Sequence, residues 1–197
     1  MENATKCIHA GYTPKNGESR MIPIIQSTTF KYDTSEDMGK LFDLEASGYF
    51  YTRLQNPTND MVAGKICALE GGSAAMLTSS GQAANFFAAF NIASNGDHIV
   101  ASSSIYGGTF NLFNVTMRKM GVDFTFISPD SSDEESQAAF KPNTQAVFGE
   151  TIANPALTVL TSSDGQKSPT KMAFPSLWTT LLPRRLTAVP LNGGQTS

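Results

Sequence analysis

The hydrophobic residues after position 56 alternate between helical and strand spacing. A helix is predicted over 57–69, because Val62, Ile66 and Leu69 recur at the i, i+4, i+7 spacing that places them on one face. Asn56-Pro57-Thr58 is a helix start, and Gly71-Gly72 is a helix stop. Similar patterns predict, in chain order, strand 74–77, helix 82–93, strand 98–101, helix 107–120, strand 122–127, an acidic helix over 129–140 and strand 145–148.

This alternation indicates the fold class. Strands separated by helices of this length form βαβ units, so the chain is predicted to be α/β, with a mostly parallel sheet and helices on both faces. The first 56 residues are less regular, with an extended stretch at 23–30 and an acidic helix near 35–44. We therefore divide the chain into an N-terminal arm (1–56), an α/β domain (57–160) and a tail (161–197).

The composition is that of a globular protein. A chain of 197 residues that is 40% hydrophobic can bury the core of one ordinary domain. Its apolar runs stop at about a dozen residues, short of the roughly 20 that cross a bilayer, and its first residues lack the pattern of a signal peptide. We expect a cytoplasmic protein with no membrane partner. The two cysteines and two histidines lack metal-ligand or disulfide spacing, so no metal site is expected (Cys7, Cys67, His9 and His98).

The tail differs from the rest of the chain in charge. Residues 1–160 hold 10 Lys and Arg against 16 Asp and Glu, whereas residues 161–197 hold 4 against 1. The tail also contains the only tryptophan and shows no sustained helix or strand spacing. Four cations spread along it make a poor nucleic-acid arm, so no nucleic-acid partner is expected.

A candidate anion site lies in the loop Ser79-Ser80-Gly81-Gln82. In a parallel sheet, ligands bind where strands end and loops lead into helices. Gly81 would let a ligand approach the backbone, and the unpaired N–H groups and the dipole of the following helix would favour a phosphate. The loop matches neither the Walker pattern nor the dinucleotide glycine pattern. The alternative is that Ser80 is an ordinary helix cap.

Four further residues could complete a binding site. Tyr106, in the next strand-to-helix loop, could stack on a planar ligand or could be a core residue of a turn. Tyr51 and Arg53 lie two residues apart, so an extended segment would place both on one face, suited to binding a phosphate; a surface salt bridge would also explain Arg53. Asn154 follows strand 145–148, where its amide could contact a ring substituent or belong to an Asn-Pro turn.

Over residues 5–160 the chain resembles the pyridoxal phosphate enzymes of cysteine and methionine metabolism, and most of all those that act on O-acetylhomoserine. The resemblance rests on the order of six motifs: Q-S-T-T-F, Y-T-R-L-Q-N-P-T, L-E-G-G-S-A-A, S-S-G-Q-A-A, Y-G-G-T and E-T-I-A-N-P. It implies that residues 57–160 form part of a fold type I, aminotransferase-like large domain. It also implies pyridoxal phosphate as the cofactor.

The resemblance also implies a role for each candidate residue. Gly81 and Gln82, in the loop that includes Ser80, would hold the cofactor phosphate through backbone N–H groups. Tyr106 would stack on the pyridine ring as a catalytic residue, and Asn154 would contact the hydroxyl side of the ring. Tyr51 and Arg53 would reach the cofactor phosphate of a neighbouring subunit.

The implied reaction is γ-replacement on a small amino-acid substrate, in which acetate leaves O-acetylhomoserine and sulfide or a thiol adds. Relatives of full length would form homotetramers built from dimers that share active sites. A cystathionine or methionine γ-lyase of the same family is one alternative. A noncatalytic α/β domain that binds phosphate or nucleotides is another.

Two residues that the resemblance requires are missing from the tail: an aspartate in D-N-T and a Schiff-base lysine. Lys171 follows Asn154 by only 17 residues, too few for the strand and helix that should intervene. The gene can instead be read in a shifted frame beyond this point. Each codon of that frame consists of the third base of one codon of the present tail and the first two bases of the next. Trp178-Thr179 then encodes aspartate, and the tail permits V-D-N-T-F-A-T-P-I-N-C-R-P-F-E-W-G-A-D-I. We therefore expect a frameshift near Leu160, and an inactive, poorly folded chain.

Overall fold

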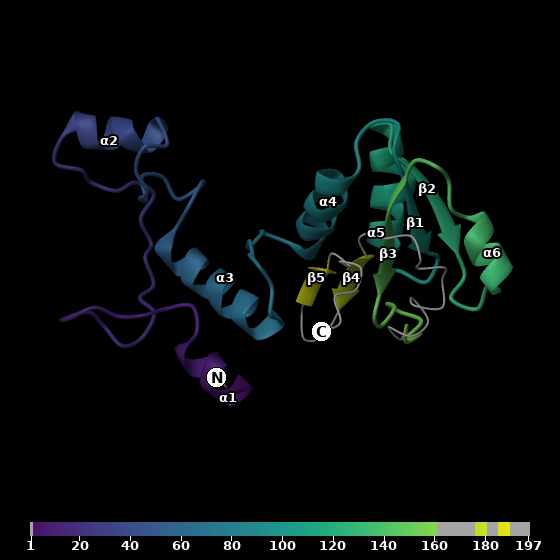
Figure 1. The fold of residues 1–197 in the computed structure, drawn as a ribbon, viewed down its shortest axis with the longest axis horizontal. Helices are drawn as coiled ribbons and strands as arrows, with labels where there is room; N and C mark the ends of the chain where they lie inside the picture. The colour runs from purple at the N-terminus through teal and green to yellow at the C-terminus, as the bar shows by residue number, and fades with distance from the viewer. Residues whose placement is uncertain (1, 161–175, 181–184, 190–197) are drawn as a thin grey trace, which may run out of the picture. The chain divides into compact units, whose positions relative to one another are not determined.

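The computed structural model describes residues 2–160, 176–180 and 185–189. The chain divides into two compact units, residues 1–77 and 78–197 (Figure 1). Within the described ranges, no helix combines the length and apolar character needed to cross a membrane. Of the predicted tail (161–197), only residues 176–180 and 185–189 are among the described residues.

The first unit contains three helices: α1 (Asn3–His9), α2 (Ser35–Phe42) and α3 (Pro57–Glu70). Side-chain caps explain where α2 and α3 begin. Thr34 Oγ1 accepts the N–H of Asp37 at 3.1 Å, and Asn56 Oδ1 accepts that of Thr58 at 2.9 Å. α3 ends at Gly71, whose φ of 67° is in the left-handed region. The helices predicted over 57–69 and near 35–44 are confirmed.

The sequence patterns do not predict α1, because this helix depends on contacts with a distant segment. None of its residues is buried, so it lacks an apolar face. Lys65 of α3 donates through Nζ to the carbonyl oxygens of Cys7 and Ile8 at 2.9 and 3.0 Å. These carbonyl groups lie in the last turn of α1, and a cation stabilises the C-terminal end of a helix. Gly11 (φ 82°) follows so close to α3 that a Cβ there would lie 2.2 Å from the carbonyl oxygen of Met61.

The second unit is built on a five-stranded sheet: β1 (His98–Ser102), β2 (Asp123–Ile127), β3 (Thr144–Glu150), β4 (Ser176–Thr180) and β5 (Arg185–Val189). The strand order is β2-β1-β3-β4-β5. β1 to β4 run parallel, and β5 runs antiparallel to β4. This mostly parallel sheet confirms the predicted α/β fold class.

Helices lie on both faces of this sheet. The chain passes from β1 to β2 through α5 (Gly107–Asn111) and the π-helical turn η1 (Leu112–Met117), then returns to the other side of β1 through α6 (Asp133–Ala138). Crossovers between parallel strands are right-handed, so connections that move in opposite directions lie on opposite faces. Figure 1 shows α6 on the other side of the sheet from α4 (Gly81–Ile92) and α5.

Aromatic packing connects η1 to the central strands. Phe113 is fully buried. Its ring stacks on that of Phe124 with centroids 4.8 Å apart, and meets that of Phe148 edge-on at 4.7 Å. Such pairs contribute about 0.5–1.5 kcal/mol each beyond their burial. The three rings come from η1, β2 and β3, so they hold the crossover helix against these two strands, and the end of β3 contributes to the candidate site.

One expectation about a strand is wrong. Residues 74–77 form no strand; they pair with no described neighbour, and Met76 is 72% exposed. A short apolar run becomes a strand only beside a partner. The tail, which shows no strand spacing, nevertheless contributes β4 and β5. β4 pairs with the edge of β3 through its backbone, which requires no side-chain pattern.

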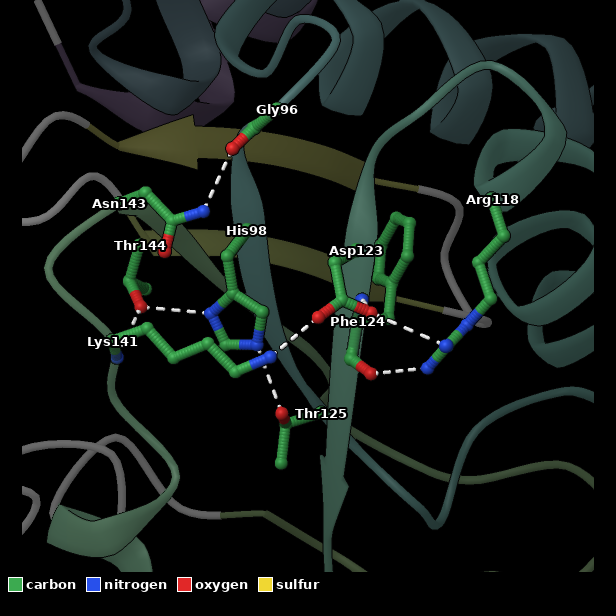
Figure 2. A network of polar contacts seen from close by, with 9 residues as sticks. All are labelled: Gly96, His98, Arg118, Asp123, Phe124, Thr125, Lys141, Asn143 and Thr144. Atoms are coloured by element: carbon green, nitrogen blue, oxygen red, sulfur yellow. Dashed lines mark hydrogen bonds and ion pairs between the residues drawn. The ribbon is translucent and has the colours of Figure 1, made fainter.

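A buried histidine joins the amino ends of three strands (Figure 2). His98 of β1 is fully buried. Its Nδ1 lies 2.8 Å from Thr144 Oγ1 of β3, and its Nε2 lies 2.8 Å from Thr125 Oγ1 of β2. Both ring nitrogens therefore have hydroxyl partners, and the imidazole connects β1 to each of its neighbours.

The surroundings of His98 favour its neutral form. Burial is the main cause that lowers its pKa, and the ammonium group of Lys141 lowers it further; Arg118 acts in the same direction, whereas Asp123 opposes it. Asp123 forms ion pairs with both cations. The hydrogen bond from Lys141 is the main cause that lowers the pKa of Asp123, so this carboxylate stays ionised near neutral pH.

We predict that the protein loses stability as the pH falls from about 7 to 5. The folded pKa of His98 lies below the unfolded value of about 6.5, so its stabilisation is present above that pH and is lost as the pH falls through the folded pKa. Urea unfolding should show a smaller loss in His98→Gln than in the wild type. His9→Gln is the control, because His9 is exposed. Equal losses in all three proteins would contradict the prediction.

Candidate functional site

The site predicted from the sequence falls at the carboxyl ends of β1 and β3. β2 lies on one side of β1, and β4 lies on the far side of β3, so the connections that leave β1 and β3 diverge. In open parallel sheets, ligands bind in the crevice between two such connections. Tyr106 follows β1 and Asn154 follows β3, which places both loops at this point of the sheet.

A hydrogen bond joins these two loops. The N–H of Tyr106 donates to Glu150 Oε2 at 3.0 Å, and Glu150 is 1% exposed at the end of β3. Because a buried carboxylate needs hydrogen-bond partners, this bond constrains the backbone that follows β1. The Tyr106 side chain itself is 44% exposed. It is therefore not a core residue, and its ring is accessible to a ligand.

The first turn of α4 supplies hydrogen-bond donors. Ser80 caps the helix: its Oγ accepts the N–H of Ala83 at 3.1 Å, and its carbonyl oxygen accepts that of Ala84 at 3.1 Å. The N–H groups of Gly81 and Gln82 have no intrahelical acceptor. A Cβ at Gly81 would meet no atom within 4 Å, so no described residue packs against this glycine on that side. Ser80 is thus a helix cap, and the cap leaves two donors available.

Gly108 brings the ring of Tyr106 and the amide of Gln82 together. A Cβ at Gly108 would lie 2.5 Å from Tyr106 Cε1 and 2.6 Å from Gln82 Nε2. Both side chains therefore pack against the bare Cα of this glycine. The aromatic ring and the first turn of α4, predicted separately as ligand-binding features, lie side by side in the second unit.

Asn154 lies in a tight loop after β3. Ile152 and Val159 form an antiparallel bridge, and the N–H of Leu157 donates to the carbonyl oxygen of Ala153 at 2.8 Å. Asn154 is partly buried inside this loop. The loop leaves β3 at the same sheet edge as Tyr106, which is where the sequence places this amide.

Tyr51 and Arg53 belong to the first unit. Tyr51 forms an isolated antiparallel bridge with Thr29. The guanidinium carbon of Arg53 lies 5.1 Å from the centroid of the Tyr51 ring, a cation–π contact. The phenol and the guanidinium are therefore adjacent, as the prediction of a shared face requires. The ion pairs among the described residues do not include Arg53.

Sequence reasoning missed three buried polar residues of this region: Asn85, Thr109 and Glu150. Asn85 is 8% exposed and Thr109 is 1% exposed, and Asn85 Nδ2 donates to Thr109 Oγ1 at 3.1 Å. A signal was present, because Asn85 interrupts an otherwise apolar helix and Glu150 ends a buried strand. Polar residues at such positions need hydrogen-bond partners.

These features define a class of protein. It is an α/β protein whose parallel sheet carries a ligand site where its connections diverge. Helix N-terminal donors favour a phosphate, and an exposed ring can stack on a planar heterocycle. A phosphorylated planar cofactor suits both.

Comparison with known proteins identifies the family. Residues 4–164 match the family of Cys/Met metabolism PLP-dependent enzymes, and the chain belongs to it. It is 46% identical over 157 residues to the O-acetyl-L-homoserine sulfhydrylase of Corynebacterium glutamicum, covering 79% of this chain and 36% of that protein. It is 44% identical over 153 residues to the L-methionine gamma-lyase of Treponema denticola, covering 77% and 38%.

A solved structure supports the same family. The O-acetylhomoserine (thiol)-lyase from Campylobacter jejuni, which carries N'-pyridoxyl-lysine-5'-monophosphate, has a TM-score of 0.81 at 29% identity, over 91% of this chain and 44% of that one. This likeness confirms the predicted fold type. The chain spans 36–38% of the length of the two relatives above.

The residues present fit pyridoxal phosphate, the cofactor of this family. Two N–H groups at the start of α4 have no intrahelical acceptor, and no atom lies within 4 Å of a Cβ at Gly81, so nothing crowds this glycine where a phosphate would approach. Tyr106 offers an exposed ring next to Gln82. These residues would hold the phosphate and the pyridine ring, respectively.

We predict that Gly108→Ala weakens the binding of pyridoxamine 5'-phosphate by about three- to tenfold, the range expected for loss of an aromatic contact. The new methyl group must displace the Tyr106 ring and the Gln82 amide, which are movable side-chain ends. Gly107→Ala is the matched control, because a Cβ there meets no atom within 4 Å. Calorimetric titration measures both affinities, and equal affinities in the two variants would contradict the prediction.

Proposed function

We propose that the full-length protein of the restored reading frame is a pyridoxal phosphate-dependent transferase that replaces the acetate of O-acetylhomoserine by sulfide or a thiol, and that this 197-residue chain, which lacks the Schiff-base lysine, is inactive. The observation that carries this proposal is the pair of open N–H donors at Gly81 and Gln82 beside the exposed ring of Tyr106. The names of the relatives support it, since they include O-acetyl-L-homoserine sulfhydrylases and homocysteine synthases. The cofactor, when bound, supplies the electron sink that the replacement needs.

Each residue has a proposed role. The N–H groups of Gly81 and Gln82 hold the phosphate, and Ser80 orders the turn that presents them. Tyr106 stacks on the ring, and Glu150 fixes the backbone from which Tyr106 projects. Asn154 contacts the hydroxyl side of the ring.

A neighbouring subunit would complete the phosphate site. Tyr51 and Arg53, adjacent in the first unit, would reach the phosphate of a second copy. A cation is needed there to match the charge of the phosphate. Two cations of the second unit, Arg118 and Lys141, are engaged by Asp123 at the amino ends of the strands. We therefore propose a homo-oligomer, located in the cytoplasm, with a small amino-acid substrate and no membrane or nucleic-acid partner.

A γ-lyase acting on methionine or cystathionine is the second candidate. It is favoured by the 44% identity to the L-methionine gamma-lyase of Treponema denticola. The two activities share the cofactor and the proposed residues, and differ in whether a sulfur nucleophile adds. A noncatalytic phosphate-binding domain would bind phosphate without responding to the cofactor ring.

The tail, in our proposal, is read out of frame. The aspartate that the shifted frame encodes falls on the codons of Trp178 and Thr179, within β4, which lies parallel to β3. The carboxylate would thus belong to the strand next to the one that carries Glu150. This placement supports the reading of residues 177–180 as a family strand that begins V-D-N.

We predict that Gly81→Pro weakens the binding of pyridoxamine 5'-phosphate by about tenfold or more, because it removes one charge-assisted hydrogen bond. Proline is tolerated at the first position of a helix, and Ser80 already has the extended backbone (φ −159°, ψ 157°) that precedes a proline. Gly81→Ala, which keeps the N–H, should bind as the wild type does. Pyridoxamine, which lacks the phosphate, should bind all three proteins alike. The same loss in both variants would show that the N–H is not the cause.

We predict that resequencing the gene from the codon of Ala153 to well past that of Ser197 reveals one additional base near Leu160. The restored frame should read V-D-N-T-F and continue to a Ser/Thr-Thr-Lys segment. Chromosomal DNA and transcript are sequenced separately, so that a change in either is seen. An unchanged frame in both would overturn the frameshift and leave the cofactor-site proposal standing.

A further inference from the structure

Thr52, the residue between Tyr51 and Arg53, is attached to a distant segment of the first unit. Its N–H donates to the carbonyl oxygen of Thr28 at 2.9 Å, and its hydroxyl donates to the carbonyl oxygen of Ser27. Thr52 is therefore fixed through both its backbone and its side chain, by acceptors that no local sequence pattern supplies.

Asn56 extends this attachment. The residue is 5% exposed, and its Nδ2 lies 3.0 Å from the carbonyl oxygen of Ile25 and 3.2 Å from Thr52 Oγ1. Its Oδ1 accepts the N–H of Thr58 and so caps α3. A helix cap needs only the side-chain oxygen, so capping does not explain the two bonds that the amide hydrogens make. Those two bonds hold Thr52 and the segment before α2 together.

The chain turns where Thr52 is attached. The carbonyl oxygen of Tyr51 accepts the N–H groups of Leu54 at 3.0 Å and Gln55 at 3.1 Å. Arg53 is exposed in this turn, and its guanidinium carbon lies 5.1 Å from the centroid of the Tyr51 ring. The turn thus presents a phenol and a cation together, while the threonine between them is held by the protein.

A fixed turn favours the binding of an anion by Arg53. A long, exposed side chain on a free turn loses conformational freedom when it binds a ligand, and this loss lowers affinity. The hydrogen bonds of Thr52 and the contact with the Tyr51 ring restrict Arg53 before a ligand arrives. The guanidinium then offers its N–H donors to a phosphate at a smaller entropic cost.

We propose that Thr52 and Asn56 are positioning residues that fix the turn carrying Tyr51 and Arg53, so that this pair binds the cofactor phosphate of a second copy of the protein. This inference rests on the proposed function, because it assumes that a second copy completes the phosphate site. Thr52 and Asn56 act through Arg53 and do not themselves touch the ligand.

The test compares the calorimetric affinities of the 197-residue chain for pyridoxamine 5'-phosphate and for pyridoxamine, which lacks the phosphate. Thr52→Val keeps the shape of the side chain and removes the hydroxyl. We expect it to weaken binding of the phosphorylated ligand by about three- to tenfold and to leave pyridoxamine unaffected, because only the phosphate contact depends on the turn. Thr52→Ser, which retains a hydroxyl, should bind as the wild type does.

Asn56→Ser is the second variant. Serine keeps the cap of α3 but is too short to replace the bonds to Ile25 and Thr52. We expect the same selective loss as in Thr52→Val. Because the two residues act as one unit, the double variant should lose no more affinity than the weaker of the two single variants. Additive losses would show that the two residues act separately, and would overturn the shared role.

Thr58→Val is the matched control. Thr58 Oγ1 donates to the carbonyl oxygen of Pro23 at 2.8 Å and accepts the N–H of Ile25 at 2.9 Å, so the substitution removes a hydroxyl that binds the same segment. It leaves the bonds of Thr52 in place, and both affinities should stay within about twofold of the wild type. Equal losses in Thr58→Val and Thr52→Val would show that any loosening of this segment lowers affinity, and would refute the positioning role.

Arg53→Gln separates this inference from the proposed function. It should weaken binding of the phosphorylated ligand by about tenfold or more, and Thr52→Val should then add less than about twofold. If Arg53→Gln has this effect and Thr52→Val has none, or if Thr52→Val acts fully in both backgrounds, the positioning role is wrong and the shared phosphate site stands. If Arg53→Gln has no effect, the shared site is wrong and the inference fails with it. Near-ultraviolet circular dichroism shows whether each variant retains its packing.

Discussion

The hydrogen bond from the N–H of Tyr106 to the carboxylate of Glu150 is the constraint on which the candidate site depends. It joins the loop after β1 to the end of β3, the two strands whose connections diverge. Glu150 is buried, so moving this loop would remove a hydrogen bond from a carboxyl group in the protein interior. Gly108 then allows the Tyr106 ring and the Gln82 amide to pack together, which brings α4 to the same point. The position of the site thus follows from sheet topology and one buried carboxyl group.

The two ends of the central strands differ in how their polar groups are used. At the amino ends, His98 has a hydroxyl on each ring nitrogen, and Asp123 is paired with two cations. These groups are satisfied within the protein, so they contribute to stability and leave little capacity for a ligand. At the carboxyl ends, the first N–H groups of α4 remain without protein partners in the described ranges. Binding capacity is therefore concentrated at one edge of the sheet.

Local signals account for the elements that were predicted correctly. Asn56 and Ser80 cap helices through hydrogen bonds to residues two or three positions later, so a short window of sequence contains both partners. The cap, the open donors and the exposed ring were likewise visible in short motifs. The errors have the opposite character. Residues 74–77 resemble a strand but have no partner, and α1 forms because Lys65, far along the chain, donates to its last carbonyl oxygens.

The sequence by itself determined the order of helices and strands in the α/β unit, the donors at the start of α4, and the family to which the chain belongs, because each depends on neighbouring residues or on motifs in a fixed order. Only the tertiary structure decided that Glu150 accepts the N–H of Tyr106, and that the Tyr106 ring and the Gln82 amide pack against Gly108. It also decided that Thr109 lies between the amides of Asn85 and Gln82. Those partners are 24 to 44 residues apart, and residues that distant meet only when the crossovers and the packing of Phe113 have placed the strands and helices.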